Sequence, residues 1–470
     1  MIKIKHILYS LCLLLFMVAC NKAEEIEKIP VVANKYDPSK PIAINEILPV
    51  RGIIDQTFII NGNFPTKLSD IKVYFGDKKA VLTATDGISV TGLVPKQPDG
   101  LNQISVVLGS DSIVPDGLNF KYKQSRSVKT IAGKLGVDQW MSNSDYAGAP
   151  LDAVTFGNIH YVAALAGVAE DNIFLIETGW GNRLILLSQD DNQVQVLSTP
   201  DNLSCPTVNS TRDAFYVTTF WDRNHGIHYY SKANSWESSS TGITVAKSDL
   251  PGAKVPSLTF GEDDNWLYLM DVEGRIAEVD LHEKTYKVYT SAAKKPGGLN
   301  PDNYGGEIKG DLPDSFGDWT DSFITYSKYH KCFFVSFSNQ HAIYKLVKNA
   351  DNSWTSTLYA GNNGQGIELG HRLIDARLNH PHGLVVNEEG EIFVANKGSC
   401  AWCGDGHVIL RIIGDVVDVI AGKPGSNNPL VNGDPLEATF RVPNNISIDS
   451  DGNYIISGGD DRTVRKLSIE

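Results

Sequence analysis

Short hydrophobic runs, each bounded by turn-forming residues, recur from residue 42 almost to the last residue of the chain. The clearest group lies within residues 379–422, where runs rich in Val, Ile, Leu and Phe alternate with Gly, Asn and Asp. The runs have the length of strands, and the residues between them favour turns. The group is therefore predicted to form an antiparallel meander of four strands, at 383–386, 391–395, 407–412 and 416–421.

The last strand of this meander has copies elsewhere in the chain. Its sequence VVDVIAG at 416–422 is similar to VKTIAG at 128–133 and TSTLYAG at 355–361. Looser copies at 194–199, 242–246 and 287–291 bring the number of predicted outer strands to six. A supersecondary unit that recurs in this way is the sequence signature of a repeat architecture. Three inner strands are expected beside each copy, within 159–188, 206–232, 256–281, 322–347, 383–413 and 444–469.

The last repeat has only three strands of its own. The strand at 128–132 is expected to supply the fourth, because pairing the first strand with the last closes a ring and removes exposed sheet edges. The segments DARL…PHG at 375–383 and EATF…PNN at 437–445 resemble the opening motif of NHL repeats. This resemblance implies a six-bladed β-propeller over residues 124–470.

An all-β pattern of a different kind precedes the repeats. Strands are predicted at 42–47, 57–60, 71–75, 80–83, 88–93, 103–108 and 118–122, which indicates a small β-sandwich. The segments PIAI at 41–44, FIINGNF at 58–64 and VYFG at 73–76 resemble the IPT/TIG domain of the immunoglobulin-like class. The resemblance implies an IPT/TIG domain over residues 37–123 that serves as a stalk.

The first residues are typical of a secretory signal. A basic start is followed by an apolar stretch at 7–19 that is too short to span a bilayer. Ala19 followed by Cys20 resembles a bacterial lipobox, which implies that residues 1–19 are removed and that Cys20 carries lipid; the alternative is ordinary cleavage. Residues 20–36 are polar and predict a flexible tether. The expected location is the outer membrane or cell surface of a Gram-negative-type bacterium, with the lipid as the only membrane contact.

Composition and charge limit the partners. The chain of 470 residues is 42% hydrophobic and carries a formal net charge of -13. An acidic surface argues against nucleic acid and anionic membranes as partners. We expect a monomer without a cofactor, whose partner is a glycan or an envelope protein.

Loop lengths predict which face of the propeller binds. The long loops, at 134–150, 292–319, 362–377, 423–441 and 396–406, all open on one face, and insertions on one face of a repeat protein mark its binding side. Indole rings beside polar side chains suit sugar recognition; the alternative is that each ring packs its own loop. The candidate ligand-binding residues on this face are Trp180, Trp221, Trp319, Trp402, His380, His382, Asn396, Asp222 and Asp460.

Two further functions stay open. One is a propeller-type hydrolase or lyase, for which His382, with a metal at the channel mouth, is the candidate catalytic residue. A ring of Asp, Asn and Glu side chains at the second-strand ends could hold a cation or could cap loops. No nucleophile-elbow, zincin, Walker or dinucleotide motif is present, so binding is favoured over catalysis. A protein scaffold without a small ligand is the third function. Cys400 and Cys403 are expected to form a disulfide, with a zinc site or free thiols as alternatives, whereas Cys205 and Cys332 are expected to be buried.

Overall fold

The computed structural model describes Ser39 and residues 43–469, apart from 99, 109–110, 116, 135–146, 168–169, 179–181, 199–202, 220–223, 313–321, 362–363, 400–405 and 426–428. The chain divides into two units between Gln124 and Ser125. Both consist of strands, with short 3-10 turns η1 (Leu68–Asp70), η2 (Lys232–Asn234), η3 (Ala292–Lys294), η4 (Pro301–Asn303) and η5 (Ser338–Gln340). Within the described residues, no helix is long and apolar enough to cross a membrane.

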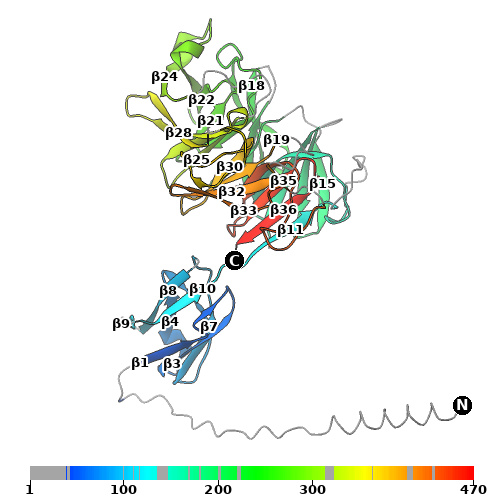
Figure 1. Ribbon diagram of the computed structural model, residues 1–470. Helices are drawn as coiled ribbons and strands as arrows, with labels where there is room; N and C mark the ends of the chain where they lie inside the picture. Colours follow the sequence, from blue (N-terminus) through cyan, green and yellow to red (C-terminus); the bar gives the residue numbers. More distant parts are fainter. Residues whose placement is uncertain are drawn as a thin grey trace, which may run out of the picture. The chain divides into compact units, whose positions relative to one another are not determined.

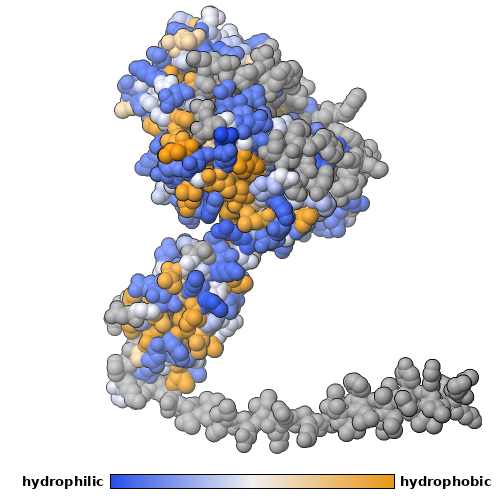
Figure 2. All heavy atoms as spheres, viewed as in Figure 1, coloured by the Kyte–Doolittle hydropathy of each residue, from blue (hydrophilic) through white to orange (hydrophobic). Residues whose placement is uncertain are grey.

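The first unit is a sandwich of two sheets, as predicted. One sheet has the order β1 (Ala43–Leu48), β3 (Thr57–Asn63), β7 (Ser89–Leu93), β6 (Val81–Thr85). The other has the order β2 (Arg51–Gly52), β10 (Asn119–Tyr122), β8 (Gly100–Leu108), β4 (Ile71–Phe75), β5 (Lys78–Lys79), with β9 (Asp111–Ile113) also on β8. Phe75 lies between Phe58 of the first sheet and Phe120 of its own, with both pairs of ring centroids 5.1 Å apart. Figure 2 shows hydrophobic and hydrophilic residues intermixed on the visible surface of this unit.

The second unit is a six-bladed β-propeller, as predicted (Figure 1). Blade one is β12 (Asn158–Leu165), β13 (Asn172–Thr178), β14 (Arg183–Ser188) and β15 (Gln193–Ser198). Blade two is β16 (Thr207–Val208), β17 (Ala214–Thr218), β18 (His225–Ser231) and β19 (Ser238–Val245). Blade three is β20 (Ser257–Phe260), β21 (Trp266–Met270), β22 (Ile276–Asp280) and β23 (Thr285–Thr290).

The remaining blades complete the ring. Blade four is β25 (Ser322–Ser327), β26 (Cys332–Phe337), β27 (Ala342–Lys348) and β28 (Trp354–Gly361). Blade five is β30 (Pro381–Val386), β31 (Ile392–Asn396), β32 (Val408–Ile413) and β33 (Val416–Ala421). Blade six is β34 (Pro443–Ile448), β35 (Tyr454–Gly458) and β36 (Val464–Ile469), completed by β11 (Arg126–Ala132). The innermost strand of each blade contacts the innermost strands of both neighbouring blades, so the six strands surround a central channel.

The ring is closed by the predicted pairing of its first strand with its last. β11 runs antiparallel to β36, with Val128 opposite Leu467, and the two strands lie side by side in cyan and red in Figure 1. On its other edge, the Val128 N–H donates to the Gly433 carbonyl at 2.8 Å. Both Val128 and Leu467 are fully buried. The closing strand therefore forms part of the hydrophobic core as well as completing the sheet.

Strands in the middle of the blades are buried on both faces. All residues of β26, β31 and β35 are buried. Each blade is covered on either side by a neighbouring blade, which explains why the sequence shows continuous hydrophobic runs here instead of alternation.

Two predicted loops contain additional strands. β24 (Tyr304–Gly310), within the predicted loop 292–319, pairs in parallel with β23 and β28 and joins blades three and four into one nine-stranded sheet. β29 (Gly370–His371), within the predicted loop 362–377, pairs with β33. The sequence of β24, YGGEIKG, lacks a strand pattern because Ile308 is its single buried residue. Ile308 packs in the cluster that contains Trp354 of blade four, so the contact that fixes β24 is distant in sequence.

Candidate functional site

Side chains of one blade satisfy the inner edge of the next. The innermost strand of a blade has one edge without a strand partner, and its N–H groups need acceptors. Val162 N donates to Asn445 Oδ1 at 3.1 Å, so blade six binds blade one. In the same way, Ile324 N of blade four donates to Ser257 Oγ of blade three at 3.0 Å. Small polar residues therefore occupy channel positions for a structural reason.

Three rings block the channel partway along its length. Tyr161 of blade one and Phe323 of blade four meet edge to face, with ring centroids 6.0 Å apart. Blades one and four are opposite each other in the ring, so this contact crosses the channel. The His382 ring of blade five lies 4.5 Å from the Phe323 ring. All three side chains are buried; we call them the channel plug.

A cavity of about 200 Å³ lies on one side of this plug. Its walls come from all six innermost strands, and they run from the level of Phe323 toward the carboxyl ends of those strands. The turns that follow the innermost strands are short, so we call this side of the propeller the short-loop face and the opposite side the long-loop face. The lining residues are 162–163, 205–208, 212, 257–259, 323–325, 384–386 and 445–448.

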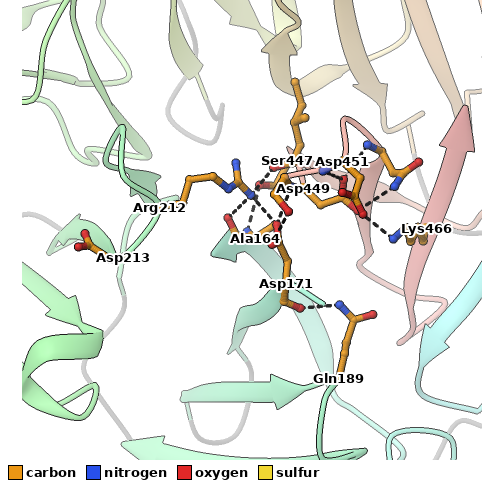
Figure 3. Close-up of polar contacts among 12 residues, drawn as sticks. Ala164, Asp171, Gln189, Arg212, Asp213, Ser447, Asp449, Asp451 and Lys466 are labelled. Atoms are coloured by element: carbon orange, nitrogen blue, oxygen red, sulfur yellow. Dashed lines mark hydrogen bonds and ion pairs between the residues drawn. The ribbon is translucent and has the colours of Figure 1, made fainter. Parts of the chain in front are cut away.

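Arg212 is the charged residue among those lining residues, and the sequence did not single it out. It lies in the turn after β16, with a positive φ of 56°. Its Nη2 donates to the carbonyls of Ala164 at 2.6 Å and Ile448 at 2.8 Å, and to Asp171 Oδ2 at 2.8 Å (Figure 3). Asp171 also accepts from the N–H and the hydroxyl of Ser450, at 2.7 and 2.8 Å. Arg212 therefore joins blades one, two and six at the short-loop end of the cavity.

Cys205 lines the same cavity. Its Sγ accepts a hydrogen bond from Asn445 Nδ2 at 3.2 Å, and burial raises the pKa of its thiol well above the ordinary value. Cys332 is also free, and burial raises its pKa to about 11. The predicted burial of both thiols is confirmed. Thiols with raised pKa values are poor nucleophiles at neutral pH.

On the long-loop face, the ring at the second-strand ends caps loops. Asn396 Oδ1 accepts from Asn379 N at 2.9 Å, and its Nδ2 donates to the Gly406 carbonyl at 2.8 Å. In blade three, the buried Asp271 accepts from Gly252 N at 3.1 Å and pairs with Arg275 at 3.0 Å. Each side chain ties the segment before the innermost strand to the end of the second strand.

The same device recurs in blades one and six. Glu177 accepts from Gly157 N and pairs with Arg183 Nη1 at 2.9 Å. In blade six, the capping residue is Asp461, which accepts from Arg441 N. The adjacent Asp460, which the sequence had selected, is half-buried and accepts from the amide nitrogen of Asn158 at 3.2 Å. The ring at the second-strand ends was expected either to hold a cation or to cap loops, and these contacts favour loop capping.

The two candidate histidines occupy different environments. His380 Nδ1 lies 2.8 Å from Asn379 Oδ1, and its ring meets the His341 ring edge to face at 4.6 Å. Burial lowers the pKa of His341. His382 belongs to the channel plug, where its Nδ1 lies 3.0 Å from the Asn444 carbonyl. Within the part of the chain that the structure describes, no three His, Cys, Asp or Glu side chains form a group that could hold a metal.

The predicted aromatic surface remains a prediction. Trp180, Trp221, Asp222, Trp319, Cys400, Trp402 and Cys403 lie outside the described residues. Among the described candidates, His380 and Asn396 both contact Asn379, whereas Asp460 contacts Asn158 at the boundary between blades six and one.

Comparison with known proteins agrees with the fold of both units. Residues 41–122 match the family model of the IPT/TIG domain. The first unit is an IPT/TIG domain. A comparison with curated protein sequences gives no match.

Solved structures from Bacteroides match the chain over both units. A structural genomics protein of unknown function from Bacteroides thetaiotaomicron is 23% identical, with a TM-score of 0.73 over 93% of this chain and 100% of its own. An auxiliary nutrient binding protein from Bacteroides ovatus is 19% identical, with a TM-score of 0.56 and the same coverage. A second such protein, from Bacteroides thetaiotaomicron, is 18% identical, with a TM-score of 0.54 over 93% of this chain and 99% of its own. These likenesses extend over both the IPT/TIG domain and the propeller, and they show the fold.

Proposed function

We propose that this protein is a lipid-anchored binding protein of the bacterial envelope, which binds a glycan on the long-loop face of its propeller. The lipid on Cys20 holds the chain at the membrane, and the IPT/TIG domain acts as a stalk. The glycan contacts come from the tryptophans of the long loops, with their rings against the apolar faces of the sugars.

The observation that carries the proposal is the closed channel beneath this face. The Tyr161–Phe323 contact crosses the channel, and the capping side chains Asn396, Asp271 and Glu177 are engaged with loop N–H groups. An enzyme site needs titratable groups that converge on a reacting atom. Here the polar groups hold loops in place, an arrangement that supports a binding surface better than a reaction centre.

The contacts of His382 weigh against the alternative of a hydrolase or lyase. Its Nδ1 faces the Asn444 carbonyl, and its ring packs on Phe323 as part of the channel plug. A buried imidazole between a carbonyl and a phenyl ring is suited to packing. The description of two proteins with the same two-domain fold as auxiliary nutrient binding proteins adds support for a binding role.

Binding to an oligosaccharide array and retardation in polysaccharide-containing gels test the proposal. The purified chain is compared with Trp221→Ala and Trp402→Ala, each of which is expected to weaken binding about two- to tenfold, because a specific contact of an aromatic ring contributes about 0.5–1.5 kcal/mol. Tyr329→Ala is the matched control, since Tyr329 is a 62% exposed aromatic residue on the short-loop face. Glycan binding that neither tryptophan variant weakens, or the absence of binding to any glycan, contradicts the proposal.

A further inference from the structure

The described residues that line the cavity below the channel plug combine apolar side chains with hydrogen-bond donors and include no carboxylate. Among its described lining residues, Arg212 is charged and none is Asp or Glu. We propose that this cavity is a second binding site, which takes a small organic carboxylate with its anionic group on Arg212. The site is separate from the glycan surface, because the Tyr161–Phe323 contact lies between them.

The guanidinium of Arg212 is held in place by one of its nitrogens. Nη2 makes all the hydrogen bonds that the side chain forms with the described residues, to Asp171, Ala164 and Ile448. Nε is buried without a partner, and Nη1 likewise makes no bond within the described parts of the chain. Figure 3 shows the guanidinium approaching Ala164 and Asp171 from one side. An arginine fixed in this way loses little conformational freedom when a carboxylate binds to Nη1, which, unlike Nε, is not among the buried nitrogens.

Three hydroxyl groups add to the donors of the cavity. Ser447 Oγ accepts from Ala164 N at 3.2 Å, and Thr207 Oγ1 accepts from Phe260 N at 3.4 Å. In both, the hydroxyl hydrogen has no acceptor among the described residues. Thr325, two residues beyond Phe323 in β25, lines the same level of the cavity. Since a serine or threonine hydroxyl can donate and accept at once, these groups remain able to donate to a ligand.

Charge and size narrow the ligand class. The nearest carboxylate, Asp171, already accepts from Arg212 and from the N–H and hydroxyl of Ser450. Asp171 balances part of the charge of Arg212, so the donors left facing the cavity are Nη1 of Arg212 and the Ser447 and Thr207 hydroxyls, which favour an acceptor-rich molecule such as a carboxylate. The volume of about 200 Å³ admits one small molecule and excludes an oligosaccharide. At its short-loop end the cavity reaches the surface beside Arg212, whose side chain is 26% exposed.

Binding to the purified full chain can be measured with three probes. Acetate is the smallest carboxylate, glucuronate is a sugar acid, and glucose is the uncharged counterpart of glucuronate. We expect binding of a carboxylate probe and no binding of glucose in this cavity. Arg212→Gln is expected to weaken carboxylate binding at least about tenfold, because hydrogen bonds to charged groups are the stronger ones. Thr207→Val, which removes a hydroxyl at nearly constant shape, is expected to weaken binding severalfold.

Cys205 provides a readout in the unmodified protein. It is 8% exposed and lines the cavity, whereas Cys332 is 1% exposed and does not line it. Because burial raises the pKa of Cys205, methyl methanethiosulfonate is applied in excess at alkaline pH. A bound carboxylate is expected to slow the modification of Cys205 and to leave that of Cys332 unchanged. Mass spectrometry of the two peptides separates these reactions from any at other cysteines. Protection of Cys205 also places the probe in the cavity, and therefore distinguishes this site from the glycan surface.

The outcomes divide clearly. Protection of Cys205 by acetate or glucuronate, lost in Arg212→Gln, supports the proposal. If Arg212→Gln fails to fold, the test rests on two other results. Carboxylates must protect Cys205 in the unmodified chain, and this protection must be weaker in Thr207→Val. Carboxylates that leave Cys205 as reactive as before, or glucose that protects it equally well, overturn the proposal whether or not the long-loop face binds glycans.

Discussion

Tyr161 and Phe323 belong to opposite blades of the propeller, and their ring centroids lie 6.0 Å apart across the channel. The contact divides the channel into a long-loop side and a cavity on the short-loop side. It also links the two halves of the ring through their innermost strands. One aromatic pair therefore has both a structural and a functional consequence.

Phe323→Ala is expected to destabilise the propeller and to open the channel. Removal of a buried phenyl ring costs about 3–5 kcal/mol in the free energy of unfolding. Chemical denaturation monitored by tryptophan fluorescence measures the change, with Tyr329→Ala, which removes a 62% exposed ring, as the control. A loss no larger than that of the control would show that the two rings do not support each other.

The hydrogen bonds of Asn445 connect three blades. Oδ1 accepts from Val162 N of blade one, and Nδ2 donates to Cys205 of blade two. Asn445→Ala leaves the Val162 N–H buried without an acceptor, which costs about 1–3 kcal/mol. The same denaturation measurement applies, and hydrogen exchange at Val162 is expected to accelerate. Unchanged exchange at this amide would disprove the inter-blade role of Asn445.

The hydrogen bonds of Asp249 predict that the stability of the propeller depends on pH. Burial alone would raise its pKa, but hydrogen bonds from Asn303 and Tyr286, both at 2.7 Å, and from Asn300 N hold the pKa below the ordinary value. A carboxyl with a lowered pKa stabilises the fold above its unfolded pKa, and this contribution is lost as the pH falls through the folded pKa.

Asp249→Asn is therefore expected to reduce the free energy of unfolding by about 1–3 kcal/mol at about pH 7. The difference is expected to be smaller at about pH 3, which lies below the unfolded pKa of about 3.9, so that the stabilisation by the carboxylate is being lost. Denaturation curves at the two pH values provide the test. A difference that is equal at both values, or larger at the lower one, contradicts the assignment.

Ring closure by β11 predicts a difference between two truncations. A chain that begins at Ser125 keeps β11, whereas a chain that begins at Lys134 exposes the edge of β36. The shorter chain is expected to aggregate, since an unpaired strand edge is a template for association. Size-exclusion chromatography and thermal unfolding compare the two. A monomeric Lys134 chain with the same melting temperature would show that closure adds nothing to stability.

Much of the fold could be predicted because one repeat preserves its pattern. The strand predicted at 416–421 has those bounds in the structure, and the copy predicted at 128–132 lies within β11, Arg126–Ala132. β24 was missed because its position depends on Ile308 packing with Trp354, a contact between residues distant in sequence. The periodicity of a segment cannot report a partner in another blade.

The candidate site was less predictable for a related reason. Aspartate and asparagine serve equally as ligands and as loop caps, and the N–H groups that Asn396 and Asp271 cap lie across a loop. No sequence pattern identified Arg212 as a candidate. It stands in a polar turn, and its carbonyl partners Ala164 and Ile448 lie 48 and 236 positions away in the sequence. Its place in the cavity follows only from the closure of the ring.

The central claim is that the long-loop face binds a glycan without changing it. The most direct measurement incubates the purified chain with the glycan that it retains best and records both occupancy and glycan mass over time. The account predicts saturable binding, lost in Trp221→Ala and Trp402→Ala, with the glycan recovered intact and with His382→Ala still able to bind. Conversion of the glycan to a product, abolished by His382→Ala in a variant that remains folded, would contradict it.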